Sequence, residues 1–296
     1  MNFYVWTGLV NTVTTVLAAI FVGSRHQHDP RRITFVFFTT SVSIYSFFYF
    51  LWQLTMTAQT APMLCRALMA GAIFIPATFL HHIATLLGVT QVPWRRQLIR
   101  WGYAIAAVLL VTDATSLLVR GVAPRLSFPY WPLPGPFFKF YTVWFFAYVI
   151  YAIWLMCRAY LSATGALRNQ LRYLLIGTLI AFAGGSTNFF LWYNILIPPF
   201  GNIVVPFYTI LAALAAVRYQ LMDIKVAITQ TGFLLGTYLV VLGAPFLIGW
   251  LWRPWLEKQL GQDWWLAPLG LCTALATAGP FAYAYLRRQA EEHLLS

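Results

Sequence analysis

Residues 138–160 read FKFYTVWFFAYVIYAIWLMCRAY, an almost unbroken apolar stretch with one basic residue near each end. A helix rises about 1.5 Å per residue, so about 20 apolar residues match the roughly 30 Å hydrocarbon core of a bilayer. Similar stretches fill nearly the whole chain, of which 60% is hydrophobic and 9% charged. We therefore predict an all-α polytopic membrane bundle of about nine transmembrane helices, at 4–23, 33–55, 62–89, 99–118, 138–160, 171–195, 202–219, 231–252 and 264–286.

The distribution of Lys and Arg predicts the orientation of this bundle. Thirteen of the nineteen lie in the loops after the first, third, fifth and seventh helices or in the C-terminal tail, and six lie on the opposite face. Because cytoplasmic loops carry the excess of basic residues, we expect the N-terminus outside and the C-terminus in the cytoplasm. The net charge of +12 then reflects basic loops at anionic headgroups, and nucleic-acid binding is a poor interpretation.

The spacing of the apolar stretches divides the chain into four parts. Residues 1–219 are expected to form a seven-helix block, and 220–230 a juxtamembrane connector. Residues 231–286 then form a hairpin of two transmembrane helices. The tail 287–296 is charged and lacks Gly and Pro, so it is expected to begin a cytoplasmic signalling helix.

Few polar groups fall within the apolar stretches, and each is costly in lipid. Gln53, Arg66, Asp113 and Asn188 are all predicted in the outer half, where they could line a polar, ligand-binding cavity. We place Asp113 about five residues from the end of its helix, at a depth similar to that of Arg66, so that an ion pair is geometrically reasonable. The alternative is ordinary hydrogen bonding between helices, with Arg66 reaching toward the interface.

The segment 125–146 (RLSFPYWPLPGPFFKFYTVWFF) is the most unusual part of the chain. Its four prolines prevent a helix at its start, and its aromatic side chains would be poorly placed in free water. One interpretation is an aromatic belt at headgroup level. The other is a lid in which Tyr130 and Trp131 contact a small apolar or amphiphilic ligand.

Small residues and prolines mark places where helices can bend or approach closely. Gly184, Gly185 and Pro206 are of this kind, and we expect them to take part in signal relay. The adjacent His81 and His82 diverge by about 100° on a helix, so they cannot readily share a metal. The sequence predicts no metal site and no cofactor.

The stretch from 168 to 224 resembles the N-terminal seven-helix sensor region of bacterial membrane histidine kinases. The matching pieces are the entry RNQLRYLL (168–175), Gly184–Gly185 followed by Asn188, Pro198–Pro199 with Gly201, and the closing RYQLMDI (218–224) with Asp223. Residues 228–246 and 275–295 look like the two-helix extension that precedes a GAF or PAS module and the kinase core in some of these kinases. The likeness is weaker, though compatible, over 1–167.

This resemblance implies a transmembrane sensory input module of a two-component system in the bacterial cytoplasmic membrane. It also implies a homodimer, and a downstream kinase or GAF/PAS module in cis or in trans. Asp223 joins the residues expected to relay the signal. No phosphoacceptor helix and no ATP-binding domain is recognisable, so we expect no kinase activity from this chain.

Three further functional classes fit the sequence less well. A membrane enzyme needs convergent acids, bases, nucleophiles or metals, and the Asp113 group could supply one such residue but no convincing set. A retinal-binding sensor needs a buried lysine, whereas all three lysines (Lys139, Lys225 and Lys258) fall at helix ends or in loops. A small-molecule or lipid transporter usually shows inverted repeats and central charges, which the sequence lacks. Transport remains the alternative to signalling.

Overall fold

The computed structural model describes residues 3–23, 29–55, 57–218 and 251–260. The chain divides into two compact units, 1–216 and 217–296, and the first contains most of the described residues. The expected connector at 220–230, most of the hairpin at 231–286, the tail at 287–296 and Asp223 lie outside the described residues. In the second unit, the helix α9 (Arg253–Leu260) is described.

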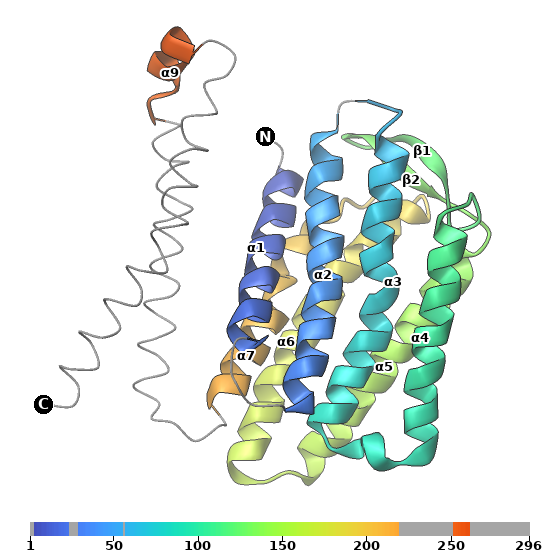
Figure 1. Cartoon of the computed structure of the whole chain (residues 1–296), viewed down its shortest axis with the longest axis vertical. Helices are drawn as coiled ribbons and strands as arrows, with labels where there is room; N and C mark the ends of the chain where they lie inside the picture. Colours follow the sequence, from blue (N-terminus) through green and yellow to red (C-terminus); the bar gives the residue numbers. More distant parts are fainter. Residues whose placement is uncertain (1–2, 24–28, 56, 219–250, 261–296) are drawn as a thin grey trace, which may run out of the picture. The chain divides into compact units, whose positions relative to one another are not determined.

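Three long helices, α1 (Phe3–Gly23), α2 (Pro30–Leu54) and α3 (Ala61–Leu86), lie side by side with α2 in the middle (Figure 1). Asp29 caps α2 by accepting the N–H of Arg31 at 2.9 Å, and Pro30 occupies the first turn, where its missing N–H costs nothing. Gly71 lets α3 approach α2 closely, because a Cβ at this position would lie 2.7 Å from the Ser41 carbonyl oxygen. A larger residue would push the two helices apart.

The fourth helix, α4 (Pro93–Asp113), differs from the predicted range of 99–118 at both ends. Asp113 is its last residue rather than lying five residues from the end. The hydroxyl groups of Thr112 and Thr115 bond to the backbone carbonyls of Leu109 and Thr112, at 2.8 and 2.6 Å. Such local side-chain bonds compete with the helical ladder, which explains why a run of Thr, Asp and Ser ends the helix early.

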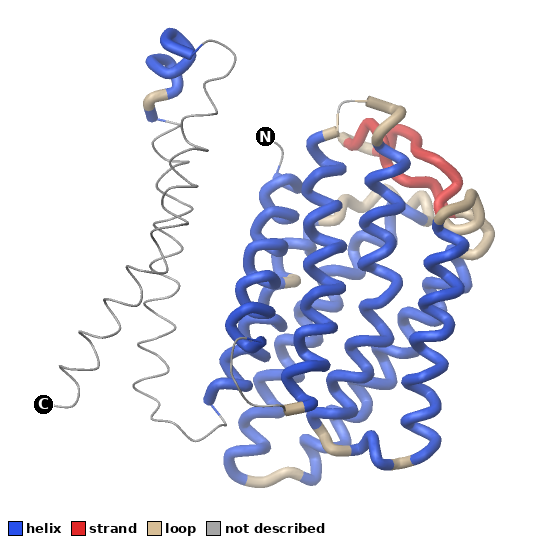
Figure 2. The backbone as a smooth tube through the Cα atoms, in the orientation of Figure 1, coloured by secondary structure: helices blue, strands red, loops and turns tan. Residues whose placement is uncertain are grey.

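A β-hairpin follows α4 and was not predicted. Strands β1 (Val119–Arg125) and β2 (Phe128–Pro134), which are red in Figure 2, pair antiparallel. They lie at one end of the helices, which we call the hairpin end. Three of the prolines in this segment fall within β2. A two-stranded sheet tolerates them because both of its strands are edges. The prolines therefore exclude helix, as expected, without excluding strand.

The remaining helices of the first unit are α5 (Phe138–Ser162), α6 (Gly165–Trp192) and α7 (Pro206–Arg218). A short 3-10 helix, η2 (Phe200–Val204), joins the last two. The prediction placed Pro206 inside a helix at 202–219, whereas Pro206 is the first residue of α7. Proline fits this position because the first turn leaves its N–H groups without intrahelical partners.

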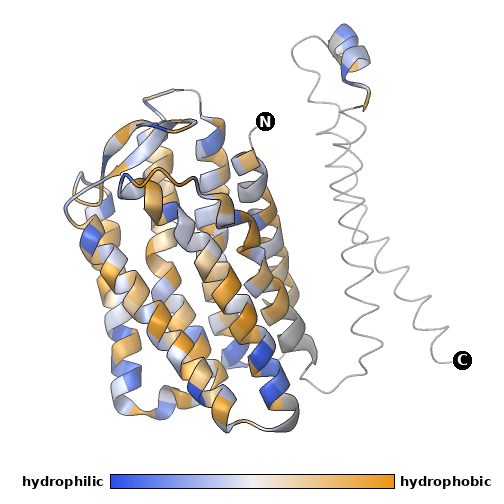
Figure 3. Ribbon diagram, turned by 180° about the vertical axis from the view of Figure 1, so that it is seen from behind, coloured by the Kyte–Doolittle hydropathy of each residue, from blue (hydrophilic) through white to orange (hydrophobic). Residues whose placement is uncertain are grey.

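Five of the described helices are long and apolar enough to cross a membrane: α1, α2, α3, α5 and residues 167–192 of α6. Apolar residues cover the sides of these helices and hydrophilic ones gather toward the helix ends (Figure 3). Large apolar side chains such as Val111 and Val143 are at least 70% exposed, as expected where lipid replaces water. The first unit is a helical bundle of a multi-pass membrane protein, and the expected nine helices and their orientation stay predictions.

Candidate ligand cavity

A cavity of about 110 Å³ lies among the helices of the first unit. Its wall takes residues from α2, α3, β2, α5, α6, η2 and α7. Twelve of its 25 lining residues are aromatic: Phe38, Tyr45, Tyr49, Trp52, Trp131, Phe138, Tyr141, Phe145, Phe182, Phe189, Trp192 and Tyr208. No charged side chain is among the described residues that line it. Such a wall suits an uncharged, largely apolar molecule.

The β-hairpin closes part of this cavity through Trp131, which is 1% exposed. The indole ring of Trp131 meets that of Trp52 edge to face, with 5.2 Å between the ring centroids. The indole N–H of Trp52 donates to the Tyr130 carbonyl oxygen at 3.0 Å, which ties β2 to α2. The hairpin thus covers part of the cavity and is attached to α2 by aromatic packing and a hydrogen bond.

Three buried asparagines link α1 to two elements of the cavity wall, α6 and η2. The Asn188 amide on α6 donates to the Asn202 side-chain oxygen on η2 at 3.4 Å, and Asn11 on α1 donates to the Asn202 backbone carbonyl at 3.0 Å. Asn11 and Asn202 are fully buried. Because a buried amide without a partner is costly, these bonds specify how α1, α6 and η2 fit together.

Beside the asparagines, the backbones of α6 and η2 almost touch. A Cβ on Gly201 would lie 2.6 Å from the Gly184 Cα atom, and a Cβ on Gly184 would collide with the Gly201 carbonyl oxygen. A Cβ on the neighbouring Gly185 would meet only the Val205 methyl group at 3.5 Å, an ordinary contact. Gly184 and Gly201 are therefore required by the close approach, whereas Gly185 faces the cavity.

Besides the Tyr49 hydroxyl, four polar atoms of cavity-lining residues have no hydrogen-bond partner among the described residues. They are the Trp131 Nε1, the Tyr208 Oη, the Asn188 Oδ1 and the Asn202 Nδ2. Two of these are donors, one is an acceptor and the tyrosine hydroxyl can act as either. Buried polar groups are normally paired, so a molecule in the cavity would gain by carrying one or two polar groups of its own.

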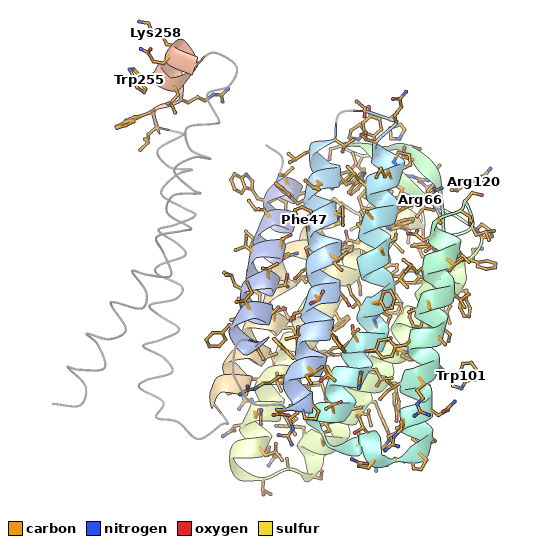
Figure 4. The ribbon with its side chains drawn as sticks, in the orientation of Figure 1. Phe47, Arg66, Trp101, Arg120, Trp255 and Lys258 are labelled. Carbon is orange, nitrogen blue, oxygen red and sulfur yellow. The ribbon has the colours of Figure 1, made fainter. Side chains whose placement is uncertain are left out.

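The structure brings together only part of the predicted site. Trp131, Asn188 and Gly185 line the cavity, whereas Gln53, Arg66, Asp113 and Tyr130 are not among its lining residues. Arg66 lies on α3 near the hairpin end (Figure 4), where its guanidinium donates to the Ala114 carbonyl oxygen at 3.2 Å.

The Arg66 contact replaces the expected ion pair with Asp113. The Asp113 side chain is 3% exposed, and its Oδ1 has no hydrogen-bond partner among the described residues. The expected polar cavity is thus an apolar one with a polar edge. Because α4 ends at Asp113, the carbonyl of Ala114 lies beyond the helical ladder and is available to accept from Arg66.

The sequence interpretation missed Asn11 and Asn202, and most of the aromatic wall. The two asparagines carried a usable signal, because polar side chains within apolar helices tend to bond across helices. The aromatic residues carried none, since 18% of the chain is aromatic and only the packing decides which rings meet.

The two adjacent histidines face different neighbours, as their divergence on a helix predicted. His82 is buried and lies 3.4 Å from the Thr34 hydroxyl through its Nδ1. The His81 Nδ1 lies 3.0 Å from the Tyr103 hydroxyl. Within the described part of the chain, no group of three or more His, Cys, Asp or Glu residues is placed to hold a metal ion.

Comparison with known proteins gives one match. No curated protein and no solved structure matches the chain. The family model described as the N-terminal 7TM region of histidine kinase matches residues 8–225, which include every element around the cavity. The chain therefore belongs to the family of N-terminal seven-transmembrane regions of histidine kinases.

Proposed function

We propose that this chain is the sensory input module of a two-component system, and that its stimulus is a small apolar or amphiphilic ligand that occupies the aromatic cavity. The module lies in the bacterial cytoplasmic membrane, with its N-terminus outside. It has no kinase activity of its own and acts on a cytoplasmic output domain. The family membership supports the signalling role.

One observation carries the choice of the cavity as the input site: its wall includes the start of the last helix of the first unit. Asn202 on η2, Val205, and Tyr208 and Thr209 on α7 all line it. Helix α7 runs from this wall to Arg218, where the connector toward the output is expected. A ligand that displaces Tyr208 would move the beginning of this helix.

The contacts around η2 favour discrete positions over gradual bending. The Gly184–Gly201 approach leaves no free space, and the Asn188–Asn202 bond is either made or broken. Close-packed contacts of this kind switch between arrangements because intermediate positions lose packing or leave polar groups unpaired. Gly184 thus has a relay role through its fit to η2, and Pro206 through its place at the start of α7.

The proposed module acts with partners. By analogy with its family it works as a homodimer, and its output is a kinase or a GAF/PAS module joined in cis or in trans. Asp223 follows α7 closely in the sequence and belongs to the proposed relay. Parallel pairing of the C-terminal tails would let a shift of α7 reach both output domains.

A chimera that joins this chain in frame to a histidine-kinase core tests the proposal. Ala181→Leu places three extra carbon atoms in the cavity wall and should mimic or block a ligand. We expect the basal autophosphorylation of the chimera to change at least about threefold in either direction, since less than 1 kcal/mol between two states suffices for this. The matched control is Ala152→Leu, at a buried alanine of α5 that does not line the cavity.

Equal changes in both variants would show general disruption of the bundle and contradict the cavity as the input site. Wild-type output in Ala181→Leu, together with uptake of a lipid or small amphiphile by proteoliposomes, would favour the transporter alternative instead.

A further inference from the structure

A second hollow lies at the end of the helices opposite to the hairpin, where α3 ends and α2 and α4 begin. This groove, of about 450 Å³, is separate from the aromatic cavity and shares no lining residue with it. Its polar wall is formed by Thr34 on α2, His81 and Thr85 on α3, and Arg96, Arg100 and Tyr103 on α4. The function proposed above does not use it.

Helical spacing places these polar groups toward one another. Arg96, Arg100 and Tyr103 are separated by four and three residues, so they share one face of α4. His81 and Thr85 are four residues apart and share the facing side of α3. The contact between the His81 ring and the Tyr103 hydroxyl joins the two faces at the inner end of the groove.

The electrostatics of the groove favour an anion. It carries two guanidinium groups, and none of the described residues that line it is acidic. The nearest acidic residue in sequence, Asp29, already accepts the backbone N–H of Arg31. The groove also lies at the N-terminal ends of α2 and α4, whose dipoles add partial positive charge, and at the C-terminal end of α3, whose dipole opposes them, so the two guanidinium groups are the main attraction for an anion.

The anion must be held by side chains. The backbone N–H groups of Arg95 and Arg96 bond to the Val92 carbonyl at 3.1 Å, so the first turn of α4 offers neither. The Arg96 guanidinium donates a hydrogen bond to the Gln91 side-chain oxygen at 3.3 Å, and this bond orients the Arg96 side chain. The two guanidinium groups supply donors of the kind that bind phosphate oxygens. The Thr85 hydroxyl already donates to the His81 backbone carbonyl at 2.8 Å, and the His81 ring and the Tyr103 hydroxyl bond to each other at 3.0 Å.

The surroundings place the groove at the depth of lipid headgroups. Trp94 and Trp101 on α4 are more than half exposed, and Figure 4 shows Trp101 pointing away from the bundle. Exposed tryptophans on a membrane helix mark the interface between acyl chains and water. Ile33, which lines the groove, is 47% exposed and offers an apolar surface beside the guanidinium groups.

From these observations we infer that the groove between α2, α3 and α4 binds the phosphate group of an anionic phospholipid, with Arg96 and Arg100 as its ligands. The glycerol and acyl chains pass outward along Ile33. This site is independent of the ligand in the aromatic cavity, so either proposal can fail without the other.

Native mass spectrometry of the full chain in neutral detergent tests this site. The purified protein is titrated with phosphatidylglycerol and, separately, with zwitterionic phosphatidylcholine. We expect wild type to retain phosphatidylglycerol preferentially and the double variant Arg96→Gln/Arg100→Gln to bind it at least about tenfold more weakly, since each cationic side chain near an anionic surface contributes about fivefold. The matched control is Arg168→Gln/Arg172→Gln, which removes the same charge from exposed positions on α6 at the same end.

Each outcome decides the matter. If only the Arg96/Arg100 variant loses phosphatidylglycerol binding, and its thermal unfolding midpoint is unchanged, the result supports the groove as the binding site. Equal loss in both double variants would show diffuse attraction to anionic lipid and overturn it, as would wild-type affinity in the Arg96/Arg100 variant. Millimolar inorganic phosphate forms a separate arm: competition with phosphatidylglycerol supports recognition of the phosphate group, whereas binding of phosphate without any retained lipid overturns the lipid as its source.

Discussion

Two adjacent glycines on α6 show how differently neighbouring residues act in this bundle. Gly184 faces the backbone of η2 and has no room for a side chain, whereas Gly185 lines the cavity and has ordinary space around it. The sequence indicated both as sites of close approach, and only the helix rotation separates them. Replacing either glycine by alanine adds one methyl group, so the two positions can be compared directly by their effect on the free energy of unfolding.

We expect Gly184→Ala to destabilise the protein by about 1–3 kcal/mol, because the new methyl group collides with the Gly201 carbonyl oxygen, and backbone cannot move aside as a side chain can. Gly185→Ala should be near neutral or slightly stabilising, since alanine favours helix over glycine by about 1 kcal/mol. Reversible unfolding in mixed micelles measures both variants. Equal effects would show that the close approach between α6 and η2 is not as described.

At the scale of elements, the β-hairpin is held to the helices by few specific bonds. The Trp52 indole donates to the Tyr130 carbonyl, Trp131 and Phe128 both contact the Trp52 ring, and Phe128 also contacts Tyr4 on α1. A cover attached in this way is able to open while the helices stay folded.

Trp52→Phe keeps an aromatic ring in place and removes the indole N–H. We expect amide hydrogen exchange in β1 and β2 to become about fivefold faster, which corresponds to the loss of one hydrogen bond of about 1 kcal/mol. Exchange in the middle of α3 should not change. Trp94→Phe, at an exposed position on α4, serves as the matched control. Uniformly faster exchange across the bundle would mean that Trp52 stabilises the whole core instead of the hairpin.

At the scale of the whole molecule, the described basic residues of the first unit are distributed unevenly between its two ends: most lie opposite to the hairpin, and Arg66, Arg120, Arg125 and Lys139 lie at the hairpin end. Arg96, Arg100, Arg168 and Arg172 lie at the end opposite to the hairpin, while the aromatic cavity reaches toward the hairpin through Trp52 and Trp131. This asymmetry is the structural counterpart of the charge bias in the sequence. It predicts that the hairpin faces the outside of the cell.

Two serine-to-cysteine variants test this orientation in a background without the three native cysteines. Ser127 is exposed in the hairpin turn and Ser162 is exposed at the opposite end, where α5 ends. In right-side-out membrane vesicles, Ser127→Cys should react with a membrane-impermeant maleimide, and Ser162→Cys should react at least about tenfold less until the vesicles are opened, because the bilayer excludes a charged reagent. The reverse pattern would invert the proposed topology and place the phosphate groove outside.

The class of protein, the approximate helices and the family could all be predicted from the amino-acid sequence. These follow from properties that act locally: the length of each apolar stretch against the thickness of a bilayer, and short motifs such as RNQLRYLL at 168–175. The predicted ends of the helices agreed less well with the structure. Helix α4 ends at Asp113, before the apolar pattern ends, because local side-chain bonds compete with the helical ladder there.

Which side chains meet became known from the packing of the helices. Asn11 and Asn202 are 191 residues apart and bond directly, and Trp52 meets Trp131 across the hairpin. Such contacts depend on the rotation of each helix about its own axis and on the packing between helices, neither of which hydrophobicity alone fixes in a chain that is apolar on nearly every side. For the same reason, the cavity that was expected to be polar is lined by many aromatic residues. Basic residues that indicated only the orientation in the sequence line a groove in the structure.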